Sequence, residues 1–216
     1  MDRRKLVSSV MTGLTAACAL LVVSILVIIL GYIAVRGLTS ISFEFLVGTP
    51  KPVGEGGGIG NAILGSFLMT AVASLIGLPL GIAGGVYLAE YGQSWFGRTV
   101  RFVADTMTGV PSIIVGIFVF AVVVLPMGRQ SGLAGSIALA IIMLPIVART
   151  TEEMILLVPK SMREGALALG APDWRVTWDI VLPAAKTGIA TGAMLAIARV
   201  SGETAPLLFT ALNSRF

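Results

Sequence analysis

The sequence predicts an all-α membrane protein, a bundle of several membrane-spanning helices. Of its 216 residues, 56% are hydrophobic and only 12% are charged, and the mean hydropathy is +0.97. A soluble domain carries roughly 25% charged residues. The apolar residues are gathered into long runs that approach the roughly 20 residues needed to cross a bilayer. Long apolar runs separated by polar segments are typical of a polytopic protein.

Five such runs are present, and we expect each to be one membrane span. They cover residues 14–35, 59–88, 110–125, 133–148 and 184–208. The third run is short, so we expect its helix to begin near Val100 and to kink at Pro111, as neighbouring helices in a bundle allow. The predicted organisation is an N-terminal tail with the first span in 1–36, an outer loop in 37–58 and a helical core in 59–216.

The charges predict the orientation of these spans. Arg3, Arg4 and Lys5 precede the first run, and the positive-inside rule places them in the cytoplasm. The segment 150–183 then also lies in the cytoplasm. The first run is longer than the apolar part of a signal peptide, so we interpret it as an uncleaved helix. The net charge of +4 is spread along the chain at the ends of the spans, which favours membrane topology over nucleic-acid binding.

Several classes of chemistry are excluded by composition. The chain has no histidine and one cysteine, Cys18, so a serine-histidine triad, a histidine-ligated zinc and a disulfide within the chain are ruled out. The sequence contains no Gly-Lys pair and hence no Walker A loop. Any nucleotide energy must therefore come from another subunit.

Glycine spacing predicts one close helix contact. Gly77, Gly81 and Gly85 recur every four residues in the second run and form a small-residue face. The glycine-rich stretch 54–58 could suggest a phosphate-cradling loop, but no strand precedes it and no lysine follows it correctly. We therefore interpret it as part of an irregular outer loop.

The segment 150–183 leaves the membrane and carries helix signals. Pro159 can enter a helix, Ser161 can cap it with Glu164 as its capping-box partner, and Gly170 can end it. Asp173 can cap a second helix, on which Trp174 and Trp178 share one face. These two tryptophans are expected to pack on the protein's own helices or at the lipid interface.

The spacing within this segment resembles the EAA loop of the membrane permease subunits of ATP-binding-cassette importers. The matching residues are Glu164, Gly165, Ala166, Gly170, Ile180, Leu182 and Pro183. Gly165 replaces the usual alanine and should loosen the helix by about 1 kcal/mol. The resemblance implies the type I importer (MetI-like) fold, with residues 59–216 as the permease core. It also implies that a short helix in 150–183 couples the permease to a separate ATPase.

Two further stretches narrow the resemblance to phosphate importers. Residues 108–116 (TGVPSIIVG) and 198–210 (ARVSGETAPLLFT) resemble signatures of phosphate permeases, the second of the PstA type, and TTEEM at 150–154 agrees with them. The resemblance implies a non-catalytic subunit without a cofactor of its own. Its implied partners are a second permease subunit (PstC-like), a pair of ATPase subunits (PstB-like) that bind ATP and magnesium, and an external phosphate-binding protein (PstS-like), in a bacterial or archaeal plasma membrane.

A charged pair lies inside the last apolar run. Arg199 is about 22 Å along a helix that begins at Ala184, and intramembrane charge usually faces a bundle interior or a water-filled path. Helical periodicity places Arg199 on the same face as Gly188 and Gly192, with Glu203 four residues later as a partner. The pair can be a structural salt bridge, or it can serve transport.

A guanidinium matches a phosphate oxyanion, so Arg199 is the predicted pathway residue, with Glu203 and Thr204 as secondary contacts. Rival functions are a permease for sulfate, molybdate or phosphonate, a secondary ion carrier or channel, and a purely structural membrane subunit. Permeases of this type have six spans, whereas five are predicted here. We therefore expect the chain to be a shortened product that lacks the last helix.

Overall fold

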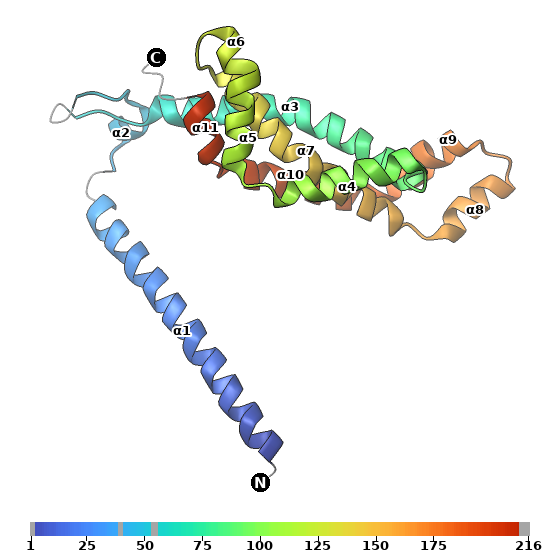
Figure 1. Cartoon of the computed structure of the whole chain (residues 1–216), viewed down its shortest axis with the longest axis horizontal. Coiled ribbons are helices and arrows are strands. Elements are labelled where there is room, and N and C mark those ends of the chain that lie inside the picture. Colours follow the sequence, from blue (N-terminus) through green and yellow to red (C-terminus); the bar gives the residue numbers. More distant parts are fainter. Residues whose placement is uncertain (1–2, 39–40, 53–55, 212–216) are drawn as a thin grey trace. The chain divides into compact units, whose positions relative to one another are not determined.

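The computed structural model describes residues 3–38, 41–52 and 56–211. Within these residues the regular structure is helical, apart from one isolated antiparallel bridge between Pro50 and Gly57. The chain divides into two compact units, Met1–Asn61 and Ala62–Phe216. The predicted coupling loop and pathway residues all belong to the second unit (Figure 1).

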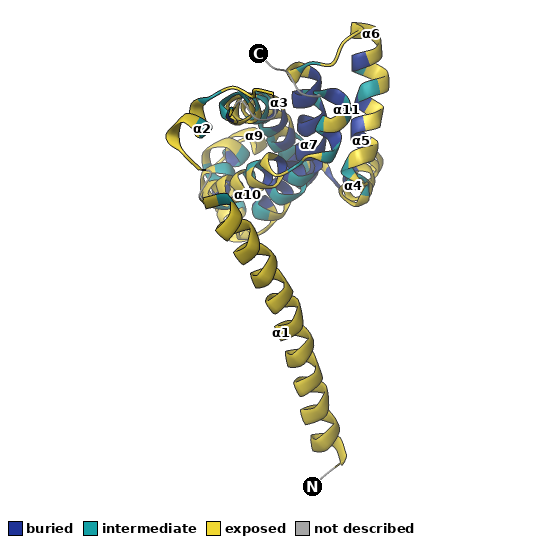
Figure 2. Ribbon diagram, turned by 90° about the vertical axis from the view of Figure 1, so that its left-hand side faces the viewer, coloured by how far each residue is buried: buried dark blue, intermediate teal, exposed yellow. Residues whose placement is uncertain are grey.

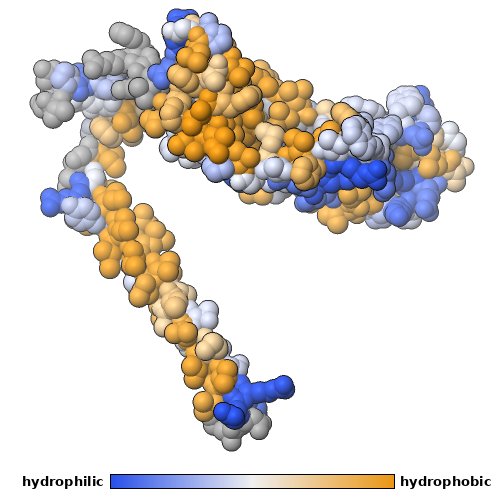
Figure 3. Space-filling model, viewed as in Figure 1, coloured by the Kyte–Doolittle hydropathy of each residue, from blue (hydrophilic) through white to orange (hydrophobic). Residues whose placement is uncertain are grey.

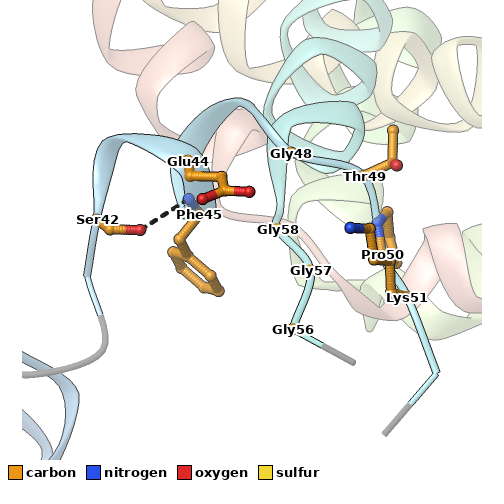
Figure 4. A pocket seen from close by; sticks show the side chains of 10 residues that line it. All are labelled: Ser42, Glu44, Phe45, Gly48, Thr49, Pro50, Lys51, Gly56, Gly57 and Gly58. Atoms are coloured by element: carbon orange, nitrogen blue, oxygen red, sulfur yellow. Dashed lines mark hydrogen bonds between the residues drawn. The ribbon is translucent and has the colours of Figure 1, made fainter. Parts of the chain in front are cut away.

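The first unit contains helix α1, Arg3–Gly37, and helix α2, Phe43–Val47. Helix α1 has 35 residues and none of them is buried (Figure 2). Helix α2 begins because the Ser42 hydroxyl oxygen accepts a hydrogen bond of 3.1 Å from the backbone N–H of Phe45 (Figure 4). The predicted outer loop 37–58 thus contains one short helix; residues 39–40 and 53–55 of that loop lie outside the described residues.

A cavity of about 610 Å³ lies beside α2, lined by the loop that follows it (Figure 4). The backbone there is held by hydrogen bonds from Gly58 N–H to the Thr49 oxygen at 3.0 Å and from Gly60 N–H to the Gly48 oxygen at 2.9 Å. In the described part of this loop no strand leads into the glycines. The strand, loop and helix context of a nucleotide-phosphate loop is thus missing there.

The second unit, together with the helix that leads into it, contains eleven elements over the described residues. They are α3 (Gly60–Tyr91), α4 (Trp95–Gly109), α5 (Ser112–Val119), the π-helix η2 (Phe120–Val124), α6 (Leu125–Met127), α7 (Gly132–Leu156), α8 (Lys160–Ala168), α9 (Asp173–Arg175), the π-helix η3 (Val176–Val181), α10 (Leu182–Ser201) and α11 (Ala205–Thr210).

The spans agree in part with the five that the sequence predicts. Among the described residues, four helices are long and apolar enough to cross a membrane: Arg3–Gly37, Gly60–Tyr91, Gly132–Leu156 and Asp173–Ser201. A fifth is obtained if α4 and the segment Ser112–Met127 count as one span. The chain is therefore a multi-pass membrane protein.

The third predicted span is broken, not kinked. Helix α4 and the segment that follows it meet at 106°, which is a sharper change than the kink expected at Pro111. Val110 is extended, with φ −72° and ψ 129°, because the ring of a following proline disfavours the helical conformation. The prediction of one kinked helix from near Val100 is therefore wrong.

The fifth predicted span ends early. Helix α10 stops at Ser201, and α11 begins after Gly202, Glu203 and Thr204. Pro206 cannot donate a hydrogen bond to the Gly202 carbonyl, and its ring clashes with that group in a continuous helix. The prediction of a single helix to Leu208 is wrong for this reason.

Helix α7 forms the core of the second unit (Figure 2), and the glycine face of α3 packs against it. Gly77, Gly81 and Gly85 are all buried. A Cβ atom at Gly81 would lie 2.7 Å from Val147 Cβ, and one at Gly85 would lie 2.5 Å from the Ala148 carbonyl oxygen. The predicted close contact is therefore confirmed, and its partner is α7.

Polar and charged residues gather at the end of the second unit that carries α8 and α9 (Figure 3). Beneath them lies a small apolar core of its own, which joins α7, α8, η3 and α10. Its buried members are Ile155, Val158, Ala166, Val176, Val181 and Ala185. The segment between α7 and α10 is thus a folded element and not a loose connection.

Candidate functional site: a coupling loop and an arginine at a helix break

The first half of the predicted coupling loop is helix α8. A cap at Ser161 would require the helix to begin after Ser161. The first residue of the helix is Lys160, directly after Pro159. Ser161 therefore lies within the first turn, and no side chain caps the helix. The prediction of a Ser161 and Glu164 capping box is wrong, because the backbone of Pro159 already provides the change of direction at which the helix starts.

Gly170 ends α8 as the sequence predicts, and the geometry is a Schellman motif. Its φ is +83°, in the left-handed region that glycine enters without a steric penalty. Gly170 N–H donates to the Leu167 oxygen at 2.9 Å, and Ala171 N–H donates to the Ala166 oxygen at 3.1 Å. These two bonds fix the direction in which the chain leaves the helix.

The three residues of the EAA signature point in different directions. Glu164 and Gly165 are exposed, whereas Ala166 is buried in the apolar core beneath the loop. A Cβ atom added at Gly165 would have no neighbour within 4 Å. Glu164 and Gly165 are thus available on the outer surface of α8, while Ala166 holds the helix to the rest of the unit.

The second half of the loop runs through α9 and η3 into α10. Ile180 and Leu182 are partly buried against the apolar core, and Pro183 is exposed. Asp173 is the first residue of α9 and does not cap it with its side chain, so the predicted cap is wrong; Pro172 occupies the capping position instead.

The two tryptophans of this region project outward. Trp174 is 61% exposed and Trp178 is 66% exposed. The Arg175 guanidinium lies 5.2 Å from the centre of the Trp174 ring, within range of a cation–π contact. Of the two expected environments, packing on the protein's own helices is therefore wrong for both tryptophans in the single chain.

An ion pair ties α8 to α3. Arg163 Nη1 lies 2.7 Å from Glu90 Oε1, and the two side chains are only 23% and 21% exposed. Partial burial makes such a pair less sensitive to screening by salt than an exposed pair. Helix α8 is therefore fastened both through Ala166 and through Arg163.

Arg199 lies in the last turn of α10, next to the break before α11. It is exposed, whereas Gly192 and Ala196 of the same helix are buried. The prediction that Arg199 shares the packed face is wrong for the single chain. The Arg199 side chain borders a small cavity whose other lining includes Thr108 and Ile146.

The predicted pair between Arg199 and Glu203 is not formed in the described residues, where neither side chain takes part in an ion pair. The helix ends between the two positions, so the four-residue helical spacing does not apply. Glu203 is partly buried and its backbone N–H donates to the Val200 oxygen at 3.1 Å. Thr204 is exposed and precedes the first residue of α11.

The structure also contains a charged cluster to which the sequence assigned no role. Glu152 on α7 is only 1% exposed and accepts hydrogen bonds from Arg101 Nε at 2.9 Å and from Arg149 Nη1 at 2.5 Å. Arg149 Nε also lies 2.8 Å from Asp105 Oδ1 on α4. We call these four residues, Arg101, Asp105, Arg149 and Glu152, the α4–α7 cluster.

The α4–α7 cluster also reaches the end of α3. Arg101 Nη1 donates to the Gly92 oxygen at 3.3 Å, and Nη2 lies 3.4 Å from the Leu88 oxygen. A Cβ atom at Gly92 would collide with the Leu88 carbonyl oxygen and with Arg101 Nη2, so a side chain there is opposed first by the backbone of α3. Arg149 and Glu152 directly follow the fourth apolar run, and Glu152 lies in the TTEEM stretch at 150–154, but neither pattern shows that Arg101 and Asp105 meet them.

Comparison with known proteins shows the family and the architecture to which this chain belongs. Residues 81–216 match the family model described as binding-protein-dependent transport system inner membrane component. The fold resembles a chain of the inward-facing MetNI methionine ABC transporter, with a TM-score of 0.64 and 22% identity, over 69% of this chain and 72% of that one. The chain therefore belongs to the family of binding-protein-dependent transport permeases and has the MetI-like architecture.

Individual relatives are more specific. The chain is 52% identical over 84% of its length to the phosphate transport system permease protein PstA of Yersinia pestis, of which it covers 62%. It is 46% identical over 99% of its length to PstA of Haemophilus influenzae, of which it covers 76%. A probable PstA of Methanocaldococcus jannaschii is 46% identical over 82% of the chain. The chain thus spans less than two thirds of the length of the Yersinia relative.

Proposed function

We propose that the chain is the membrane permease subunit of an ATP-driven importer of inorganic phosphate. Proteins called phosphate transport system permease PstA match the chain at 46–52% identity, and this observation carries the choice of phosphate. The proposed role is to form part of the path for the anion and to couple that path to a separate ATPase.

The coupling role is supported by the outward face of α8. Glu164 and Gly165 are exposed there, on a helix that is itself fixed by Ala166 and by the pair of Arg163 with Glu90. A rigid helix with an open outer face can transmit a push from a docked subunit to the helices on which it rests. In this proposal α8 is that helix, and α7 and α10 are the helices that it moves.

The transport role is supported by the position of Arg199. The Arg199 guanidinium is exposed in the last turn of a spanning helix, where a permanent charge is favourable only if it meets water, the polar lipid interface or another protein chain. A planar guanidinium binds phosphate oxygens with two parallel hydrogen bonds. Glu203 and Thr204, at the adjacent break, are proposed as secondary contacts that limit how tightly the anion is held.

The proposed partners follow from the same family. A second permease subunit would face Arg199, two ATPase subunits would bind ATP and magnesium and dock on α8, and an external protein would deliver phosphate. The chain itself is proposed to be non-catalytic. The proposed location is the plasma membrane of a bacterium or archaeon, with the N-terminus in the cytoplasm because of Arg3, Arg4 and Lys5.

The test is phosphate uptake by vesicles that contain the chain together with its partner subunits. Arg199→Gln should lower uptake by about 10- to 100-fold, the range expected for loss of a hydrogen bond to a charged group. Arg199→Lys should retain part of the activity, because the charge remains but the paired geometry is lost. Lys186→Gln, an exposed cation in the first turns of the same helix, is the matched control and should transport normally.

Assembly and ATP hydrolysis are measured on the same vesicles, so that loss of transport can be separated from loss of the complex. Normal uptake by Arg199→Gln would remove Arg199 from the mechanism. Uptake of sulfate in preference to phosphate by the unchanged chain would contradict the proposed substrate.

A further inference from the structure

Arg149 lies about one helical turn along α7 from residues that line the cavity beside Arg199. Ile142, Ile146 and Arg149 follow one another at spacings of four and three residues on α7, so they share one face of that helix. Ile142 and Ile146 line the small cavity that Arg199 borders. Arg149 therefore lies about 4.5 Å along α7 from Ile146, in the direction of the coupling loop.

On helix α4, too, a residue that lines the cavity lies three positions from a member of the Arg149–Asp105 ion pair. Thr108 lines the cavity beside Arg199, and Asp105, three residues earlier on α4, pairs with Arg149 at 2.8 Å. The order along the unit is thus Arg199, then the pair of Arg149 with Asp105, then α8. An anion that leaves Arg199 toward the coupling loop would meet Arg149 next.

The bonds of Arg149 differ in strength. Its Nη1 is held by Glu152, which is 1% exposed and is fixed in turn by Arg101. Its Nε is held by Asp105, which is 53% exposed, and an exposed ion pair contributes little. Its Nη2 lies 4.0 Å from Glu153 Oε1, beyond hydrogen-bond distance. Arg149 is therefore oriented from its buried side while its outer side can exchange one anionic partner for another.

Resting on the proposed function, we infer that Arg149 is a second anion-contacting residue of the pathway and that Asp105 is the carboxylate that the anion displaces. Glu152 and Arg101 are positioning residues that hold the guanidinium while its partner changes. Such a carboxylate competes with the anion and promotes its release, so the anion is passed on and not trapped.

The test uses thiol labelling at the displaced position. In a Cys18→Ser background the chain has no other cysteine, so Asp105→Cys provides a single reactive thiol beside Arg149. The measured quantity is the labelling rate with a negatively charged methanethiosulfonate reagent divided by the rate with a positively charged one. This ratio should be about tenfold higher with Arg149 present than in the Arg149→Gln variant. An unchanged ratio in the presence and absence of Arg149 would overturn the inference.

Protection by anions gives the second measurement on the same assembled complex. Phosphate should slow labelling of the Asp105→Cys thiol when Arg149 is present, and Arg149→Lys should retain part of the effect. If the Arg149→Gln variant does not assemble, the Asp105→Cys variant alone decides. The inference is overturned if neither phosphate nor sulfate, at saturating concentration, protects its thiol from labelling. Protection by sulfate but not phosphate would support Arg149 and contradict the proposed substrate.

Uptake separates an anion contact from a structural pair. The double variant Asp105→Asn, Arg149→Gln replaces the ion pair with two uncharged side chains that can still hydrogen-bond to each other. Glu152 retains its ion pair with Arg101 in this variant. The double variant should assemble yet lose uptake by about tenfold or more. Arg98→Gln, on the same helix and exposed, is the control and should transport normally. Normal uptake by the double variant would show that the pair is only structural.

Discussion

Glycine serves opposite purposes in two regions of the second unit. Where α3 meets α7, Gly81 and Gly85 are buried and are needed for what they lack, since any side chain would collide with α7. In the coupling loop, Gly170 is exposed and has free space around it, and is needed for its backbone conformation. The first contact sets how closely two helices pack, and the second sets where a surface helix ends.

The difference teaches that the core and the loop fail in different ways. Damage to the contact between α3, α4 and α7 should lower the stability of the whole unit, because many buried atoms depend on it. Damage to the end of α8 should leave the unit folded and alter only the loop. Four substitutions, from the largest expected effect to the smallest, can break or sharpen this contrast.

Glu152→Ala should have the largest effect. It removes a carboxylate that is 1% exposed and leaves Arg101 and Arg149 without their shared partner. We expect a loss of about 3 kcal/mol in the free energy of unfolding, measured by thermal unfolding in detergent. Glu153→Ala is the control, because Glu153 is 59% exposed and should change stability by less than about 0.5 kcal/mol. Equal effects of the two variants would contradict a central role of the buried cluster.

Gly85→Ala should have the next largest effect on stability. The new Cβ would lie 2.5 Å from both the Ala148 oxygen and Thr151 Cβ, so α3 and α7 must separate. Overpacking of this kind costs about 1–3 kcal/mol. Gly84→Ala is a matched control one residue away, since its Cβ would only touch Ala148 Cβ at 3.8 Å. A Gly84→Ala variant as unstable as Gly85→Ala would show that helix packing is not the cause.

Gly170→Ala should act locally. A residue with a side chain at φ +83° costs about 1–2 kcal/mol. We expect faster amide hydrogen exchange at the end of α8, with the global unfolding temperature unchanged. A global loss of stability equal to that of Gly85→Ala would erase the distinction between core and loop.

Gly165→Ala should have the smallest effect and the opposite sign. A Cβ there meets no atom within 4 Å, and alanine is a better helix former than glycine by about 1 kcal/mol. Amide exchange in α8 should therefore slow down. Faster exchange would show that alanine destabilises α8 and would contradict the open surroundings of Gly165.

Much of the fold could be predicted from local sequence. Apolar runs predict spans because a bilayer requires a fixed helix length, and Gly170 predicts a helix end because few residues adopt its conformation. The glycine face of α3 was also readable, since Gly77, Gly81 and Gly85 recur at helical spacing. These features depend on residues close together in the chain.

The remaining features depend on partners far away in the sequence. Glu152 and Arg101 are 51 residues apart, so the sequence cannot show that they meet. Helical periodicity cannot predict whether Arg199 is buried, because it gives the face of the helix but not what packs on that face. The break before α11 depends on the clash of the Pro206 ring with the Gly202 carbonyl, and the hydropathy of the apolar run around them does not reveal it.

The π-helix η3 gives the chain an offset between the coupling loop and α10. A π-helical segment bonds each N–H to a carbonyl five residues back, so it holds extra length that a continuous α-helix would not accommodate. One additional residue corresponds to a turn of about 100° around the helix axis. Sequence positions on either side of Val176–Val181 therefore cannot be placed on one helical wheel. A deletion of one residue within η3 would redirect α8 and its exposed face relative to α10 while every individual side chain of the loop stayed the same.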